Sequence, residues 1–217
     1  KKFQTDYSVF TNFKPDHLNW HSDIGEYFDA KMNLLHATKK KAIINSQVLT
    51  FAMENGLEYT LPENAKVYRV KEWIQKIESK NWTDGEDIVI SWRRKYALKE
   101  TNFSGIHNAL NILSAALVTN SMGICSKRTK LYLKNITGLP HRLEKIGEKN
   151  GIVFVEDSKS TSSQSLEAAL WSYGERTQNN LLLIVWGSDK WDSFAHLGVL
   201  FKKRVKALVC IGATKEL

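Results

Sequence analysis

Leu181-Leu182-Leu183-Ile184-Val185 is an unbroken apolar run, and residues 152–155 and 207–211 form two further runs of the same kind. Such runs are typical of parallel strands in a sheet that helices cover on both faces. Helical patterns at residues 163–173 and 193–203 separate the runs, so strands and helices alternate. The alternation predicts an α/β fold that begins a right-handed, doubly wound, Rossmann-like sheet.

The N-terminal part of the chain begins with a similar alternation. Strands are predicted at residues 7–13 and 41–45, and helices at residues 23–37 and 47–55. The clearest helix is predicted at residues 104–122, which Gly123 would end. These elements predict a separate first sheet with helices.

Residues 57–100 have a weaker pattern. Short strands are predicted near residues 66–68, 87–92 and 96–98, around a helix at residues 70–80. We expect this part of the chain to form an antiparallel appendage on the first sheet.

The predicted domain boundary follows a helix at residues 126–135. Gly138-Leu139-Pro140 interrupts the pattern there, which divides the chain into residues 1–137 and 138–217. A chain of 217 residues with 42% hydrophobic residues can bury two modest cores. We therefore expect two domains.

The formal net charge of +8 raises the question of nucleic-acid binding. The basic groups are scattered at the expected ends of elements, as in Lys39-Lys40-Lys41 and Lys202-Lys203-Arg204. We favour a solvated surface and expect no nucleic-acid partner, although an anionic substrate would also suit this charge.

Several common features are missing from the sequence. No stretch approaches a membrane span and the first residues have no apolar signal core, so we expect no membrane partner and a cytoplasmic protein. Cys125 and Cys210 fit no metal or disulfide pattern, so their expected role is packing.

Two motifs around the predicted boundary carry most of the chemistry. Gly138-Leu139-Pro140-His141-Arg142-Leu143-Glu144 holds a basic pair, and Asp157-Ser158-Lys159-Ser160-Thr161 holds an acid, hydroxyls and a lysine. Groups of these kinds can hold phosphates and a carboxylate together.

Five ordered motifs together resemble the Mur ligase family. To the two motifs above we add residues 12–21 (NFKPDHLNWH), 29–31 (DAK) and 105–111 (GIHNALN). The motifs at residues 138–144 and 157–161 are most similar to the D-glutamate-adding branch, and the resemblance covers nearly the whole chain. It implies that residues 1–137 are the latter part of an ATP-binding central domain with a mixed, mainly parallel sheet. Residues 138–217 would be the first part of a Rossmann-like, amino-acid-binding C-terminal domain.

The resemblance also implies a reaction. ATP phosphorylates a carboxylate of UDP-N-acetylmuramoyl-L-alanine, and the amine of D-glutamate attacks the acyl phosphate, with Mg²⁺ neutralising phosphoryl charge. Members of this branch act in peptidoglycan precursor synthesis in the bacterial cytoplasm, and we expect a monomer.

Metal-binding roles come from two of the motifs. His17 is similar to the family's magnesium-binding histidine, and Lys31 to the lysine that carries a carbamate toward a second metal ion. Without the resemblance, His17 reads as a surface turn residue and Lys31 as a solvated helix lysine. The neighbours Phe28 and Met32 favour partial burial of Lys31.

Nucleotide binding is implied for four residues. Asn108 and Asn111 share a helix face, and the family uses the first to read adenine. Arg142 would clamp the ATP γ-phosphate, and Asp157 would contact the ribose or a metal-bound water. The alternative is that both asparagines tie the helix start and that residues 157–161 form a polar loop before a helix.

Substrate binding is implied for Lys159 and Thr161, which resemble family groups near the D-glutamate carboxylate and the nucleotide, and for Lys190, which resembles a lysine that contacts D-glutamate. The resemblance also implies catalytic roles for Lys159, His17 and Lys31. Two positions depart from the family pattern: Trp186 stands where a glycine is usual, and Ser162 replaces an asparagine. Both put the amino-acid specificity in doubt.

The chain contains no Gly-x-x-x-x-Gly-Lys-Ser/Thr loop for nucleotide phosphates. We therefore expect a ligase fragment truncated at both ends and inactive alone. The alternatives are another Mur ligase or a folylpolyglutamate synthase, a noncatalytic nucleotide-binding protein, and a nucleic-acid-binding module.

Overall fold

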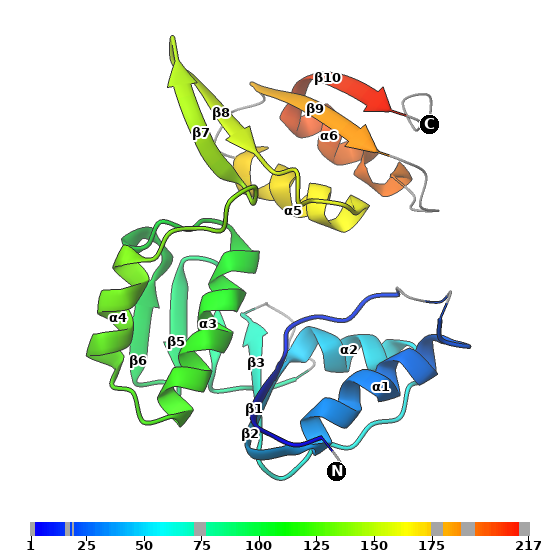
Figure 1. The fold of residues 1–217 in the computed structure, drawn as a ribbon, viewed down its shortest axis with the longest axis vertical. Coiled ribbons are helices and arrows are strands. Elements are labelled where there is room, and N and C mark those ends of the chain that lie inside the picture. Colours follow the sequence, from blue (N-terminus) through cyan, green and yellow to red (C-terminus); the bar gives the residue numbers. More distant parts are fainter. Residues whose placement is uncertain are drawn as a thin grey trace. The chain divides into compact units, whose positions relative to one another are not determined.

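The computed structural model describes residues 3–15, 18, 20–71, 77–174, 180–187 and 194–212. The chain divides into two compact units, Lys1–Ile136 and Thr137–Leu217. We call them unit 1 and unit 2 (Figure 1).

Unit 1 is built on a six-stranded sheet in the order β1-β2-β3-β4-β5-β6. Strands β1 to β4 are parallel, whereas β4, β5 and β6 pair antiparallel, which confirms the expected appendage. The strands are β1 (Thr5–Phe10), β2 (Thr38–Asn45), β3 (Ala65–Val70), β4 (Trp82–Thr83), β5 (Asp87–Ile90) and β6 (Arg94–Ala97).

Helices cover both faces of this sheet (Figure 1). Adjacent residues of a strand point to opposite faces, and in β2 Ile44 packs in the core under α1 and α2, while Ile43 packs in the core under α3. Both isoleucines are fully buried. The helices are α1 (Ile24–His36), α2 (Ser46–Glu54), α3 (Ile106–Ser121) and α4 (Ser126–Asn135), with a short 3₁₀ turn, η1 (Leu98–Glu100), before α3.

The prediction of a helix at residues 70–80 is wrong at both ends of that range, which are the parts of it that the structure describes. Val70 is the last residue of β3, residues 77–80 are not helical, and residues 72–76 lie outside the described residues. Side chains explain the described end, because the Ser79 hydroxyl and the Asn81 amide donate to the Val67 carbonyl at 2.5 and 3.1 Å. These bonds bring the chain back beside β3, where it forms β4.

Unit 2 contains two separate pairs of strands. An antiparallel hairpin joins β7 (Glu144–Lys149) and β8 (Ile152–Glu156), and a parallel pair joins β9 (Leu181–Gly187) and β10 (Val205–Gly212). The helical elements are α5 (Ser163–Gly174), η2 (Ala195–Leu197) and α6 (Gly198–Arg204). The predicted alternation of strand and helix is present.

Two details of unit 2 differ from the prediction. Strand β8 pairs with β7 rather than with β9, because Asn150 and Gly151 have φ values of 52° and 76° and form the two-residue turn of a hairpin. Helices α5 and α6 lie on one face of β9 and β10 (Figure 1). The prediction that helices cover both faces of these strands is therefore wrong for the described residues. The side chains of Leu182, Ile184 and Trp186 stay exposed on the other face of β9.

Candidate functional site

The two motifs around the boundary meet within unit 2. The backbone N–H of Lys159 donates to the His141 carbonyl at 3.2 Å, and the N–H of Leu143 donates to Asp157 Oδ1 at 3.1 Å. His141 and Leu143 have φ values of 64° and 49°, a left-handed backbone that these contacts hold in place. We call residues 138–144 and 156–161 the hairpin-base cluster.

The ring of His141 is held by Glu156, a residue that the sequence did not single out. His141 Nδ1 lies 2.5 Å from Glu156 Oε2, and the Ser158 hydroxyl donates to the other oxygen of that carboxylate. The pKa of Glu156 lies below its ordinary value of 4.5, because Ser158 and then His141 donate hydrogen bonds to the carboxylate. The position of Glu156 directly before Asp157, at the end of an apolar strand, was the only sequence signal.

Glu144 completes the support of His141. Its Oε2 accepts the backbone N–H of His141 at 2.7 Å. Ligand atoms of His141, Glu144 and Glu156 lie within 4.8 Å of one another, so within the described part of the chain these residues could meet a metal ion. Both carboxylates already accept hydrogen bonds from this chain, so the contacts suit a held imidazole and we assign no metal here.

The charged and hydroxyl groups predicted for substrates face solvent. Arg142, Lys159 and Thr161 are exposed in the hairpin-base cluster, and Asp157 is half-buried. Exposed cationic and hydroxyl groups of one cluster are of the kinds that can hold an anionic ligand.

Ser162, one of the departures from the family pattern, caps α5. Its hydroxyl accepts the N–H of Ser165 at 3.3 Å, and its own N–H donates to the Ser165 hydroxyl at 3.1 Å. Serine and asparagine are both good caps, so this change preserves the start of the helix.

The asparagines of unit 1 lie at the start of α3. The Asn108 amide donates to the Ser104 carbonyl at 2.8 Å, so it ties the helix start as the alternative interpretation predicted. Asn111 lies one turn further along and is exposed. Gly105 precedes the helix with a φ of 84°, a conformation that favours glycine.

Lys31 lies on the solvent side of α1. Its Nζ is 5.2 Å from the centroid of the Tyr27 ring, and the side chain is exposed. The expected partial burial is therefore wrong, because Phe28 and Met32 turn toward the core and away from Lys31. His17 and Lys190 lie outside the described residues.

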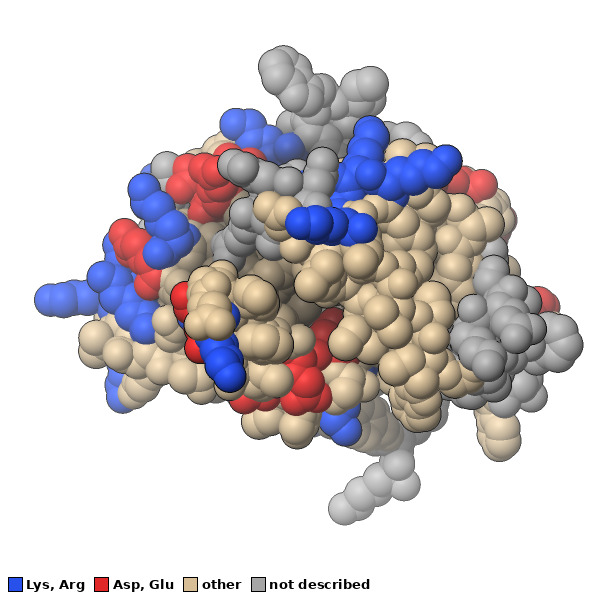
Figure 2. Space-filling model, turned by 90° about the horizontal axis from the view of Figure 1, so that it is seen from above, with Lys and Arg blue, Asp and Glu red and all other residues tan. Residues whose placement is uncertain are grey.

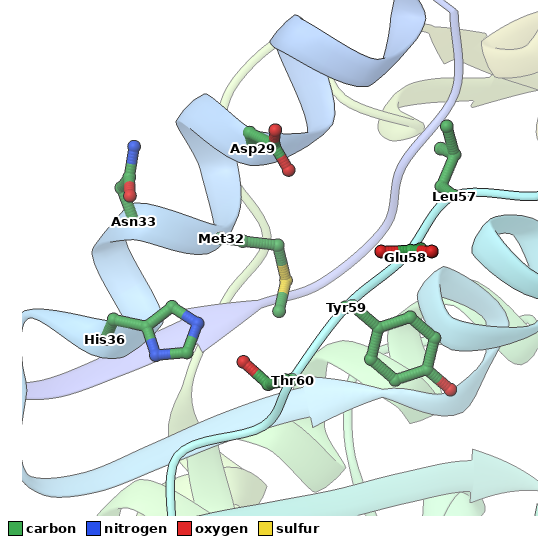
Figure 3. A pocket seen from close by; sticks show the side chains of 8 residues that line it. All are labelled: Asp29, Met32, Asn33, His36, Leu57, Glu58, Tyr59 and Thr60. Atoms are coloured by element: carbon green, nitrogen blue, oxygen red, sulfur yellow. The ribbon is translucent and has the colours of Figure 1, made fainter.

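A cavity of about 830 Å³ lies between α1 and residues 57–60. Asp29, Met32, Asn33 and His36 line it from the helix, and Leu57, Glu58, Tyr59 and Thr60 line it from the chain opposite (Figure 3). None of the predicted site residues that the structure describes lines this cavity.

The surface charge fits the expectation of scattered basic groups. On the face that Figure 2 shows, Lys and Arg side chains lie in separate groups among acidic and uncharged residues. No helix in the described part of the chain has the length and apolar character that a membrane span requires.

Comparisons with known proteins agree with the motifs. A model of the Mur ligase middle domain matches residues 1–119, which is more than half of the chain. The chain belongs to the Mur ligase family. This Mur ligase chain is 29% identical over 216 residues to the UDP-N-acetylmuramoylalanine–D-glutamate ligase of Aquifex aeolicus, covering 100% of the chain and 48% of that protein. The Geobacter metallireducens protein of the same name is 30% identical, and the match covers 99% of this chain and 46% of that protein.

Solved structures support the fold of the Mur ligase chain. MurF from Acinetobacter baumannii matches with a TM-score of 0.66 at 17% identity, over 95% of this chain and 46% of that one. MurC from Thermotoga maritima matches with a TM-score of 0.65 at 14% identity, over 98% of this chain and 52% of that one. These findings confirm the predicted family and fold class. The chain spans about half the length of the curated relatives that it matches.

Proposed function

We propose that the protein containing this Mur ligase chain joins D-glutamate to UDP-N-acetylmuramoyl-L-alanine, using ATP and Mg²⁺ in the bacterial cytoplasm. The names of the relatives support the reaction. The observation that carries the proposal is the hairpin-base cluster, because hydrogen bonds between its two segments bring together the stretches of chain that carry Arg142 and Lys159. The reaction needs such cations for its phosphoryl and carboxylate groups.

Each group in unit 2 has a proposed part. The exposed guanidinium of Arg142 would bind the γ-phosphate of ATP. Lys159 and Thr161 would bind D-glutamate, together with Lys190, and Asp157 would contact the ribose or a metal-bound water. Asp157 Oδ1 already accepts the Leu143 N–H, which fixes the orientation of the carboxylate.

The groups in unit 1 would serve the nucleotide and the metal. Asn111 is exposed and free to reach adenine, whereas Asn108 would exchange its bond to Ser104 for one to the base. An exposed Lys31 is accessible to carbon dioxide, and its carbamate would supply the oxygen ligands that Mg²⁺ prefers. The amine itself has no oxygen, so an unmodified Lys31 does not fit Mg²⁺.

The proposed function is tested by phosphate release from the full-length protein with ATP, Mg²⁺ and UDP-N-acetylmuramoyl-L-alanine. We expect release that depends on D-glutamate and is much weaker with L-glutamate or other amino acids. Arg142→Ala should lower kcat/KM on the order of 100-fold, since it removes a charge that acts on the phosphoryl group. Lys149→Ala, at an exposed lysine of the same hairpin, is the matched control and should keep full activity.

Other results would support other functions. Release with a different amino acid would reassign the substrate and implicate Trp186, which stands in place of the usual glycine. Binding of ATP without turnover would reject the ligase and favour a noncatalytic nucleotide-binding protein. We further propose a monomer without nucleic-acid partners. Salt-sensitive binding to a DNA pool would contradict the second part.

A further inference from the structure

We propose that His141 is the proton acceptor for the incoming amino acid, and that Glu156 is the positioning residue that orients it. This role rests on the proposed ligase function. The proposal gives a role to His141 and Glu156, for which the sequence motifs assign none in proton transfer. Three features carry it: the contacts that hold His141, the tautomer that they select, and the chemistry of the nucleophile.

Contacts from three sides hold His141 in one orientation. Glu144 accepts its backbone N–H at 2.7 Å, and the N–H of Lys159 binds its carbonyl at 3.2 Å. Glu156 Oε2 lies 2.5 Å from ring Nδ1, and Ser158 fixes the Glu156 carboxylate through its second oxygen. A half-exposed histidine that only solvated the surface would not need this support.

The contact with Glu156 selects the tautomer of the neutral ring. A carboxylate only accepts hydrogen bonds, so Nδ1 must carry the proton that it donates to Glu156. The lone pair of the neutral imidazole is then on Nε2, for which the described residues offer no hydrogen-bond partner. The lowered pKa of Glu156 keeps its carboxylate ionised near neutral pH. Nε2 is therefore prepared to accept a proton.

The proposed reaction requires such an acceptor. The amino acid arrives as an ammonium ion, which has no lone pair for attack on an acyl phosphate. His141 Nε2 takes one proton from the ammonium, and the imidazolium that forms is stabilised by the Glu156 carboxylate. The amine lone pair then forms the C–N bond, and the C–O bond to phosphate breaks as phosphate leaves with its electron pair and takes the second proton from the nitrogen, which leaves a neutral amide.

The neighbouring groups suit this role. The hydrogen bond from the Lys159 N–H to the His141 carbonyl places the backbone of His141 beside that of the lysine proposed for the D-glutamate carboxylate. Arg142 follows His141 directly and is exposed. One group proposed for each reactant, Arg142 for the phosphoryl group and Lys159 for D-glutamate, thus lies within the hairpin-base cluster that carries the base.

Nitrogen NMR on residues 1–217 tests the positioning role without any activity. In the neutral ring of His141 we expect a protonated Nδ1 and an unprotonated Nε2, and Glu156→Gln should shift the ring toward the other tautomer. Glu148→Gln is the matched control, because Glu148 binds Lys145 at 2.7 Å on the same hairpin and should leave the His141 signals unchanged. A protonated Nε2 in the unchanged chain would overturn the proposal.

Hydroxylamine tests the proton transfer in the full-length protein. It is mostly uncharged at neutral pH, so it can trap the acyl phosphate as a hydroxamate without a base. His141→Gln and Glu156→Gln should each lower D-glutamate ligation on the order of 100-fold. Both variants should form the hydroxamate at a rate within about threefold of the unchanged protein, since phosphorylation does not use the base. Glu148→Gln should keep both activities.

Each result decides between explanations. An equal loss of both products would overturn the proposal, because His141 would then act on phosphorylation or on folding. Full ligation by both variants would overturn it as well. If the unchanged protein forms neither product, the proposed function fails first, and the role of His141 as a base fails with it.

Discussion

At the level of single residues, buried polar side chains hold loops by bonding to backbone groups. Asn45 is 1% exposed, its amide donates to the Thr11 carbonyl at 2.9 Å, and its oxygen accepts the N–H of Gln47 at 3.1 Å. The first bond holds the chain after β1, and the second caps α2. Asn45→Ala should lower the free energy of unfolding by about 1–2 kcal/mol, measured with urea. Asn135→Ala, at an exposed helix end, should change it by less than about 0.5 kcal/mol.

Asp84 makes stability depend on pH. Partial burial raises the pKa of its carboxyl, but hydrogen bonds from the N–H groups of Asp87 and Glu86 outweigh burial and hold the pKa below 3.8. Because the pKa of Asp84 is lower in the folded protein, the ionised carboxylate stabilises the fold at pH values above 3.8. This stabilisation is lost as the pH falls through the pKa of the folded state. Asp84→Asn should cost about 0.5–1 kcal/mol near pH 7 in urea unfolding, and less near pH 3.

The control for Asp84 is Glu58→Gln, at an exposed carboxylate, which should leave the free energy of unfolding unchanged at both pH values. An Asp84→Asn effect that grows as pH falls would reverse the sign of this linkage. That result would mean that the carboxyl is destabilised when charged.

The sequence indicated part of the candidate site and missed the rest for identifiable reasons. The motifs named Arg142, Asp157 and Lys159, and the bonds between the two segments bring them into one cluster. Glu156 was missed because a single acid at the end of an apolar strand has no pattern of its own. The burial of Lys31 was misjudged because Met32, the next residue, points about 100° away from Lys31 on the helix, so the burial of Met32 does not extend to Lys31.

At the level of elements, continuous apolar runs were predictable and mixed ones were not. The runs that became β8, β9 and β10 were found, since each is apolar throughout. Strand β7 was missed because its sequence, EKIGEK, has one large apolar residue. The partner of β8 is set by the turn at Asn150 and Gly151, a local signal that the apolar pattern does not contain.

That turn gives a test of the hairpin. Gly151 has a φ of 76° with open space around its Cα, so Gly151→Ala should cost about 1–2 kcal/mol through backbone strain alone. Gly147 is also in open space, but it has an ordinary φ and lies within β7, so Gly147→Ala should be neutral or slightly stabilising. Hydrogen exchange of the β7 and β8 amides would measure both effects. Equal protection in the two variants would contradict the role of the turn.

At the level of the whole molecule, the two units have cores of different size. Unit 1 buries two clusters, one on each face of its sheet, whereas the described core of unit 2 consists of Leu166, Leu170, Leu197 and Leu200 with partly buried neighbours. Unit 2 also leaves apolar side chains of β9 exposed. Because stability rises with buried apolar area, we expect unit 2 to unfold at a lower temperature than unit 1.

Calorimetry with one substitution in each core tests this expectation. Leu113 in α3 and Leu170 in α5 are both fully buried, so truncation of either to alanine should cost about 2–5 kcal/mol. We expect two unfolding transitions, that of unit 2 at the lower temperature and that of unit 1 at the higher. Leu170→Ala should lower only the temperature of the first transition, and Leu113→Ala only that of the second. A single transition that both substitutions lower equally would show that the two cores unfold together. In that case the small core of unit 2 would depend on unit 1 for its stability.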